Sequence, residues 1–547
     1  MRLPIALCLL NFLLLESVQR QDLGPTGSAN NIDVLHYDFT ITIPDTGAWI
    51  QGKARISFCR NEPVQSVAFN LVGLHVDSVQ IDRAPSDFVY DGLRLTLPLS
   101  PTVNSVRDTL IAYVAYNGVV RDGLTIQQDD RGRWTAFGDN WPERARFWIP
   151  CVDRPDDKAT VTWNIIAPSD RQVVANGSLV RRIPFDSTSG NNHFSLTVWN
   201  ESEPISPYLM VVAVAPLTRF DLPSAVRGLG GFAEVVEQSV YVEPEFLNYL
   251  PGPFKYADDI AAYFSRLIAP FPYEKLAHVQ SSTRYGGMEN ASAIFYPSDD
   301  FEKRTLSPAV IAHETAHQWF GDAVTESKWS HLWLSEGFAT YFEELWTQYE
   351  FGDSAFKVEM SHTRYEILRS GVTRERPIID TLQTDLMALL DVNSYLKGAW
   401  VLHMLRSMLG DSVFFAGIHS YYEKYRNSCA LSEDLEREFE LQAHEDLHWF
   451  FDEWLRRPGY INLSTTWSYE PNSGKVQLTL QQTGPFPPYR FQLTAELVSH
   501  SGTRFRERID IPARDSVKVT INATPNEEPR EIVLDPDVQL LAKITSR

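Results

Sequence analysis

The chain has 547 residues, a length typical of roughly three to four domains. Hydrophobic residues make up 44% and charged residues 22%, which are ordinary globular values that exclude a long disordered chain, a collagen-like fibre and a membrane bundle. The formal net charge of −21 argues against a general nucleic-acid binder, because neutralising phosphates requires clustered lysines and arginines. We therefore expect no nucleic-acid partner.

The first residues follow the pattern of an export signal. Arg2 precedes a largely apolar run from Leu3 to Leu15, and the polar segment 16–20 closes that run. A basic start before an apolar core of about 7–15 residues is typical of a secretory signal peptide. A membrane anchor is the alternative, but a spanning helix needs about 20 apolar residues. We predict a signal peptide at residues 1–19 and an exported protein, periplasmic or extracellular after cleavage, with no stable membrane insertion.

The three cysteines beyond that segment are Cys59, Cys151 and Cys429. Their wide spacing excludes a disulfide-dense scaffold and a cysteine-based zinc module, since both need clustered cysteines. A single Cys59–Cys151 bridge and buried free thiols are both compatible with the sequence.

Alternating apolar and polar residues predict β-strands from Ile32 to about Leu217. Turn residues separate these alternating segments, as a sheet of sequential strands requires. Clear examples are residues 37–43, 93–97, 160–165 and 194–198. We predict an N-terminal antiparallel β domain over residues 22–217.

From about Tyr241 the apolar residues follow helical spacing instead. Ser307 before Pro308 is typical of an N-cap followed by proline at the first helical position, so a helix should begin there. Other helices are expected at residues 256–267, 399–424 and 435–456. These elements predict a mostly helical middle domain over residues 218–459.

Strand patterns return after Tyr460, for example at residues 476–480 and 517–521. They predict a small C-terminal β-sandwich domain over residues 460–547. The fold class that follows is a multidomain α+β protein with β, mostly helical and β domains in that order.

The helix that Ser307 begins carries an H-E-x-x-H motif, His313-Glu314-Thr315-Ala316-His317. The i, i+4 spacing places both imidazoles on one helical face, where they can hold one zinc ion. Glu314 then lies beside the ion, where it can act as the general base that takes a proton from water.

A third ligand follows the motif after eighteen residues, at Glu336. A second helix running back against the first would bring this carboxylate to the metal. Two histidines and one glutamate leave a coordination position open for water, which is the catalytic pattern of zinc ligation. We predict one Zn²⁺ per chain, held by His313, His317 and Glu336.

These residues and their neighbours resemble the zinc aminopeptidases of the aminopeptidase N and leukotriene hydrolase type, the gluzincin metallopeptidases. The resemblance rests on the motif with Glu336, on Gln318-Trp319-Phe320-Gly321-Asp322 and on Leu332 to Thr340. It implies a thermolysin-like zinc catalytic domain in the middle of the chain. The family's usual asparagine after Gly321 is Asp322 here, a change that can alter hydrogen bonding behind the ligands but replaces none of them.

The segment Gly286-Gly287-Met288-Glu289-Asn290 matches the family's G-x-M-E-N substrate loop. Glycines allow the loop backbone to approach an extended peptide closely, and a carboxylate can bind a cationic group. The resemblance implies that Glu289 binds the free α-amino group of the substrate, which makes the enzyme an exopeptidase.

Two further segments match the family. Ser394-Tyr395-Leu396-Lys397-Gly398-Ala399 implies that Tyr395 donates a hydrogen bond to the oxyanion of the tetrahedral intermediate. Pro150 to Pro155 matches a P-C-x-D-x-P signature, upstream of which family members carry a glutamine that approaches the substrate amine. Asp139 occupies that region here, and it either replaces this contact or begins a turn.

The function implied is a zinc-dependent aminopeptidase that acts on peptides with a free N-terminus. A thermolysin-like endopeptidase uses a similar zinc site, but an amine anchor at Glu289 would block internal cleavage. An epoxide hydrolase on the same scaffold is a second alternative, and a peptide-binding scaffold with a dead site is a third. The ligands, base and tyrosine are all present, which argues against the scaffold.

Overall fold

A computed structural model describes residues 31–99, 108–129, 131–186, 193–222, 236–523 and 528–546. The signal peptide predicted at residues 1–19 lies outside them. No helix within this part of the chain combines the length and apolar character that crossing a bilayer requires. The chain divides into two compact units, Met1–Lys328 with Tyr425–Ala430 and Trp329–Lys424 with Leu431–Arg547.

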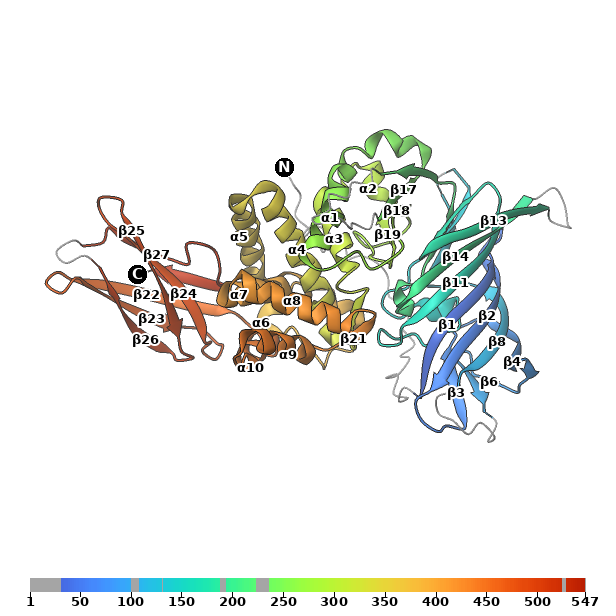
Figure 1. Ribbon diagram of the computed structural model, residues 1–547, viewed down its shortest axis with the longest axis horizontal. Helices are drawn as coiled ribbons and strands as arrows, with labels where there is room; N and C mark the ends of the chain where they lie inside the picture. Colours follow the sequence, from blue (N-terminus) through green and yellow to red (C-terminus); the bar gives the residue numbers. More distant parts are fainter. Residues whose placement is uncertain are drawn as a thin grey trace. The chain divides into compact units, whose positions relative to one another are not determined.

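The first unit contains an eight-stranded sheet in the order β13-β14-β11-β1-β2-β8-β4-β5 (Figure 1). Alternation forms these strands: the side chains of Val34, Tyr37, Phe39 and Ile41 in β1 are fully buried, and residues between them reach the other face. The sheet is mostly antiparallel as predicted, but β1 pairs with β11 in parallel. The strands are β1 (Ile32–Thr42), β2 (Trp49–Arg60), β4 (His75–Ile81), β5 (Ala84–Pro85), β8 (Leu110–Val119), β11 (Ala159–Pro168), β13 (Ser178–Asp186) and β14 (His193–Ile205).

Two smaller sheets accompany it, in the orders β3-β7-β6 and β12-β15-β10-β9. Large aromatic side chains fill the core of this region: the rings of Trp148 and Trp163 stack with centroids 5.5 Å apart, and Phe39 stacks on Trp163 at 5.2 Å. The strands are β3 (Ser66–Asn70), β6 (Val89–Tyr90), β7 (Arg94–Pro98), β9 (Leu124–Gln128), β10 (Trp134–Gly138), β12 (Gln172–Ala175) and β15 (Val212–Ala215).

The sequence did not predict a further sheet in the first unit, in the order β16-β17-β18-β19. Its strands β17, β18 and β19 run parallel, and every residue of β18 is buried. A strand buried on both faces shows no alternation, so its sequence resembles that of a buried helix. The segment between β18 and β19 carries Gly286 to Asn290. The strands are β16 (Thr218–Asp221), β17 (Glu237–Val242), β18 (Lys275–Ser281) and β19 (Ala293–Pro297).

Three helices of this unit confirm the change to helical structure. The predicted N-cap is present: the Ser307 side chain accepts a hydrogen bond from Val310 N at 3.4 Å, and Pro308 is the first helical residue. The short strands β20 (Val324–Glu326) and β21 (Ser428–Ala430) pair in parallel. The helices are α1 (Ala257–Leu267), α2 (Ser298–Glu302) and α3 (Pro308–His317).

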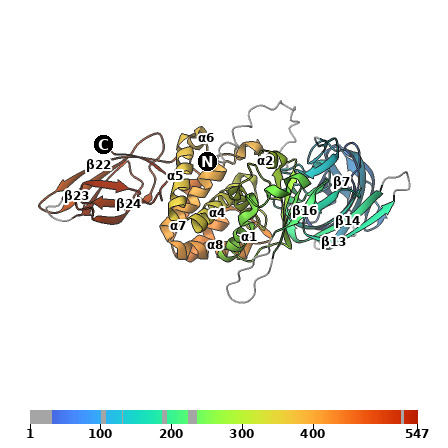
Figure 2. The ribbon, with the colours of Figure 1, turned by 90° about the horizontal axis from the view of Figure 1, so that it is seen from above.

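Helices form the first part of the second unit, where α5 and α7 lie beside α4 (Figure 2). The two long helices expected at residues 399–424 and 435–456 are each divided. Gly410 has a φ of 78° and His444 a φ of 55°, left-handed values that end a right-handed helix. The helices are α4 (Trp333–Phe351), α5 (Asp353–Arg369), α6 (Gly371–Glu375), α7 (Gly398–Leu409), α8 (Asp411–Tyr425), α9 (Ser432–Ala443) and α10 (His448–Leu455).

The C-terminal strands form the predicted β-sandwich, with sheets β26-β23-β22-β28 and β25-β24-β27. Each sheet has one buried face, for example Leu478 and Leu480 in β23 and Leu493 and Leu497 in β24. The strands are β22 (Ile461–Glu470), β23 (Lys475–Gln482), β24 (Phe491–Val498), β25 (Arg504–Ile511), β26 (Ser516–Asn522), β27 (Glu531–Leu534) and β28 (Ala542–Ser546).

Cys59, Cys151 and Cys429 are free thiols, so the Cys59–Cys151 bridge left open by the sequence does not form. Burial raises the pKa of Cys151 well above its ordinary value. Such a thiol remains protonated and behaves as a small apolar side chain.

The buried ion pair of Arg146 and Asp153 gives a test of the first unit's stability. Arg146 Nε lies 2.8 Å from Asp153 Oδ2, and the two side chains are only 5% and 1% exposed. Because Asp153→Ala leaves a guanidinium buried with part of its pairing lost, we expect a loss of about 3–5 kcal/mol in unfolding free energy. Urea denaturation measures this loss. Asp299→Ala, at the exposed Lys303–Asp299 pair, is the control and should leave the urea midpoint nearly unchanged. An unchanged midpoint for Asp153→Ala would contradict the prediction.

Candidate metal centre

Helix α3 places three residues of the predicted site together. His313, Glu314 and His317 are 7%, 6% and 1% exposed, and the Nε2 atoms of the two histidines lie 3.1 Å apart. One helical turn separates the two imidazoles, so they face the same side of α3. The i, i+4 spacing therefore has the geometric effect that the sequence predicted.

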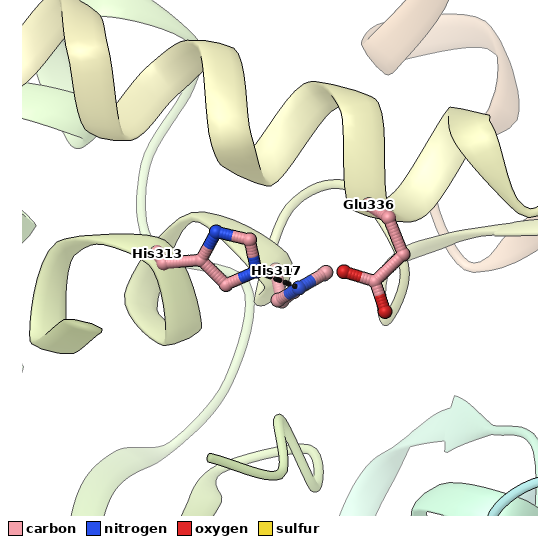
Figure 3. Close-up of side chains that lie close together, drawn as sticks. All are labelled: His313, His317 and Glu336. Atoms are coloured by element: carbon pink, nitrogen blue, oxygen red, sulfur yellow. Dashed lines mark hydrogen bonds between the residues drawn. The ribbon is translucent and has the colours of Figure 1, made fainter. Parts of the chain in front are cut away.

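Glu336, in the first turn of α4, joins these histidines. The three residues offer ligand atoms that all lie within 4.8 Å of one another, and all three side chains are buried. Figure 3 shows the Glu336 carboxylate directed toward the His317 ring. The structure thus brings together the three predicted metal ligands.

The donor set suits a transition-metal ion such as zinc. His317 Nδ1 lies 3.2 Å from the Phe320 carbonyl oxygen, which can only accept, so Nδ1 carries the proton and Nε2 presents its lone pair. Two nitrogens 3.1 Å apart can share an ion at the usual Zn–N distance of about 2.0–2.1 Å. Two imidazoles and one carboxylate form the ligand set of an open, catalytic zinc site.

Tyr395 contacts the predicted ligand Glu336. Its hydroxyl donates a 2.8 Å hydrogen bond to Glu336 Oε1. The tyrosine belongs to a π-helical turn, Asn393–Lys397, that leads directly into α7. Turns of this type occur frequently at functional sites because they redirect a side chain that a regular helix would place elsewhere.

Buried polar groups hold this π-helical turn in place. Asp391 Oδ1 accepts hydrogen bonds from the backbone N–H groups of Asn393 (2.8 Å) and Ser394 (3.1 Å). The Asn393 amide donates to the Arg376 carbonyl oxygen at 3.0 Å. Lys397 Nζ donates to the Arg457 carbonyl oxygen at 3.3 Å, and burial lowers the pKa of this lysine to about 7.

Close backbone packing fixes the distance between α4 and this turn. A Cβ atom added to Gly337 would lie 2.9 Å from the Cα and carbonyl carbon of Gly398, and one added to Gly398 would lie 3.1 Å from the Gly337 Cα. Gly337 follows Glu336, and Gly398 follows the π-helical turn. Because neither has a side chain, α4 and the turn approach closely enough for Tyr395 to reach Glu336.

The predicted substrate loop lies against Glu314. A Cβ atom on Gly287 would be 2.1 Å from Glu314 Oε1, so the glycine leaves the space that the carboxylate occupies. The loop is paired with β19 at one point, where Met288 and Phe295 exchange backbone hydrogen bonds of 2.8 and 2.9 Å. Glu289 is 6% exposed and Asn290 is fully buried. Gly286 precedes this paired segment.

Asp139 is engaged by two arginines. Its carboxylate lies 2.7 Å from Arg144 Nη2 and 3.2 Å from Arg284 Nε, and its backbone N–H donates to the Gly123 carbonyl oxygen at 2.8 Å. Arg284 is close in sequence to the substrate loop, which places Asp139 near that loop. A substrate amine would have to compete with two guanidinium groups for this carboxylate, and its contact with substrate stays a prediction.

Two residues that follow the second histidine, Gln318 and Asp322, form a buried hydrogen bond, as expected of Asp322, which the sequence placed behind the ligands. Gln318 and Asp322 are fully buried, and Gln318 Nε2 donates to Asp322 Oδ2 at 2.8 Å. Burial, followed by the charge of Glu289, raises the pKa of Asp322 well above its usual range. Lys158, from the N-terminal β region, donates to the carbonyl oxygens of Asp322 (2.6 Å) and Ala323 (2.9 Å). Gln318 directly follows the second histidine, which is a sequence signal, whereas nothing in the local sequence marks Lys158.

Known proteins resemble the chain over most of its length. Family models of the Peptidase M1 N-terminal domain and of the Peptidase family M1 domain match residues 34–209 and 255–454. Aminopeptidase 2 of Candida albicans is 24% identical over 490 residues, which are 84% of this chain and 50% of that protein. The probable aminopeptidase 2 of Sulfurisphaera tokodaii is 28% identical over 413 residues, 70% of this chain and 49% of the relative. The chain thus spans about half the length of these relatives.

A solved structure shares the fold. The aminopeptidase A of Legionella pneumophila, in complex with aspartic acid, has a TM-score of 0.80 at 16% identity, covering 95% of this chain and 60% of that one. The two family models together match the β-rich part of the chain and the part with the candidate metal centre, and the matched regions include His313, His317 and Glu336. The chain belongs to peptidase family M1, the gluzincin aminopeptidase family.

Proposed function

We propose that the protein is a zinc-dependent aminopeptidase that removes N-terminal residues from peptides. The observation that carries this proposal is the group of His313, His317 and Glu336, buried and within 4.8 Å of one another. The relatives named aminopeptidases support the reaction class. The export signal predicted at residues 1–19 leads us to propose peptides outside the cytoplasm as substrates.

Glu314 is the group proposed to move the proton. When held by the three ligands, zinc supplies Lewis-acid polarisation of the scissile carbonyl and of the attacking water. The Glu314 carboxylate, one residue from His313, accepts the proton of that water and delivers it to the leaving amine. Gly287 supports this role because only a residue without a side chain leaves room for the carboxylate at its observed position.

Tyr395 is proposed to bind the oxyanion. Its hydroxyl is anchored at Glu336 Oε1, so the phenol is already at the metal-ligand side of the site. When the scissile carbonyl becomes tetrahedral, the hydroxyl can donate to the oxygen on which negative charge develops. The anchored π-helical turn reduces the movement that this transfer of the hydrogen bond requires.

Glu289 is proposed to bind the α-amino group of the substrate. Its carboxylate is buried, and it lies close enough to Asp322 for its charge to raise the pKa of that acid. A cationic amine would offset the cost of burying the Glu289 carboxylate. An anchor at the first residue of the peptide admits only the first peptide bond to the metal, which distinguishes an aminopeptidase from an endopeptidase.

Loss of one ligand should remove the metal. The purified protein is expected to hold about one zinc ion per chain, and His317→Ala should lower this content toward zero because two remaining ligands bind weakly. Elemental analysis after dialysis measures the content. His278→Gln, a change at another buried histidine, is the control and should retain the ion. Full zinc content in His317→Ala would contradict the ligand assignment.

Removal of the proposed base should separate catalysis from metal binding. Glu314→Gln is expected to keep its zinc while kcat falls by roughly 10²–10⁴, because the amide cannot accept a proton. Turnover of a panel of aminoacyl-arylamides gives kcat, and the same panel identifies the preferred N-terminal residue. Glu302→Gln, at an exposed glutamate of α2, is the control. Wild-type kcat in Glu314→Gln would overturn the assignment of the base.

Blocking the substrate amine should abolish cleavage. A peptide that is hydrolysed with a free N-terminus should be resistant once N-acetylated, since the acetyl group removes the charge that Glu289 is proposed to bind. Glu289→Gln should raise KM for the free peptide by roughly tenfold or more. Product analysis by mass spectrometry follows both reactions. Continued cleavage of the acetylated peptide at an internal bond would identify an endopeptidase instead.

A further inference from the structure

The side chain of Gln318 joins the metal helix to the substrate loop. Gln318 immediately follows His317 and is fully buried. Its Nε2 donates to the Glu289 carbonyl oxygen at 2.8 Å and to Asp322 Oδ2 at 2.8 Å, and its Oε1 accepts from the Ser292 backbone N–H at 2.8 Å. Both amide hydrogens are therefore used, and the amide holds the loop on either side of Asn290 and Ala291.

Besides the Met288–Phe295 backbone pairing, two other side chains anchor the far end of the loop. Lys275 Nζ donates to the Ser292 carbonyl oxygen at 3.1 Å, and the Asn176 amide donates to the Ala291 carbonyl oxygen at 2.7 Å. Ser292 has a φ of 61°, a left-handed value that a serine adopts only where its surroundings impose it. These contacts fix residues 291 and 292, whereas Gln318 bonds the backbone of Glu289 itself.

The backbone contact determines where the Glu289 carboxylate can lie. A glutamate side chain has three rotatable bonds, and its reach is defined only if its backbone is fixed relative to the metal ligands. Gln318 fixes the Glu289 backbone relative to the metal ligands, because it is the residue after His317 and bonds directly to Glu289. The polar contact is also fully desolvated, so its loss leaves buried donors and acceptors without partners.

We propose that Gln318 is a positioning residue for the reaction, which holds the amine-binding Glu289 in register with the metal ligands and so gives the site its preference for a free N-terminus. This inference rests on the proposed function, in which Glu289 binds the substrate amine. Gln318 itself touches neither substrate nor metal. It determines how much more tightly the site binds a ligand with a charged amine than one whose amine is blocked.

The discrimination can be measured without turnover. The probes are the amide of the amino acid preferred in the aminoacyl-arylamide panel and the N-acetyl derivative of that amide, and calorimetric titration gives the affinity of the protein for each. The wild-type protein should bind the free-amine form more tightly. Gln318→Met removes all three hydrogen bonds and should reduce the ratio of the two affinities by roughly tenfold or more, with binding of the acetylated form changed less than about twofold. A change that only loosened the fold would weaken both ligands together.

A second variant keeps the test decisive if Gln318→Met fails to fold. Gln318→Asn keeps the amide but shortens the side chain by one methylene, so it cannot reach the Glu289 carbonyl oxygen and the Ser292 N–H together and should also lower the ratio. The control is Gln280→Met, because Gln280 is another buried glutamine of this unit, 3% exposed, that accepts from the Glu243 backbone N–H at 2.9 Å and donates to Ser298 Oγ at 3.3 Å. Gln280→Met should keep the wild-type ratio. Zinc content should match the wild type in every variant.

The outcomes separate this inference from the proposed function. An unchanged ratio in both Gln318 variants, or an equal fall in Gln280→Met, would overturn the role of Gln318 while leaving Glu289 as the amine anchor. If Glu289→Gln leaves the wild-type ratio unchanged, the proposed amine contact itself is wrong. Support for both requires that Glu289→Gln removes the discrimination and that adding Gln318→Met to it causes little further change, since the two residues then act through one contact.

Discussion

The burial of negative charge around two histidines is the constraint on which the rest of the site depends. Glu289, Glu314, Glu336 and Asp322 are all less than 7% exposed. A carboxylate removed from water is costly unless it is protonated, hydrogen-bonded or paired with a cation. Asp322 meets this constraint through a raised pKa, whereas the ligand Glu336 accepts a hydrogen bond from Tyr395 and is positioned for a divalent ion. The proposed metal ion would therefore contribute to the stability of the folded state as well as to the chemistry.

The polar network that supports these acids extends into the N-terminal β region. Lys158 bonds the turn after the metal helix, and Asn176 bonds the substrate loop as well as the Leu209 carbonyl oxygen at 2.8 Å. Burial lowers the pKa of Lys275, another loop anchor, to about 8. The Lys158–Asp322 and Asn176–Ala291 contacts each join residues more than 100 positions apart in the chain. The β region is thus part of the machinery that shapes the site, and a fragment starting at β18 would lack it.

Local sequence rules predicted the elements whose signals are periodic or positional. Alternation identified β1 and the C-terminal strands, the Ser307–Pro308 pair identified the start of α3, and i, i+4 spacing identified the metal face. The sheet around β18 was missed because full burial removes alternation, and the breaks at Gly410 and His444 depend on left-handed backbone that apolar spacing does not reveal. Gln318 could not be assigned a role because two of its three partners, Glu289 and Ser292, lie in another segment that only the fold brings to it.

The Glu314 side chain fills the space in which a side chain at position 287 would lie. The φ of Gly287 is not left-handed, so an L-amino acid would fit its backbone, and the three atoms nearest to an added β-carbon all belong to the Glu314 side chain. The two positions, 27 residues apart, therefore form a single steric unit in which the size of one side chain sets the limit for the other. In relatives, we expect the combined size of the side chains at these two positions to stay constant. A residue larger than glycine at position 287 would fit only where the acid at position 314 is shorter.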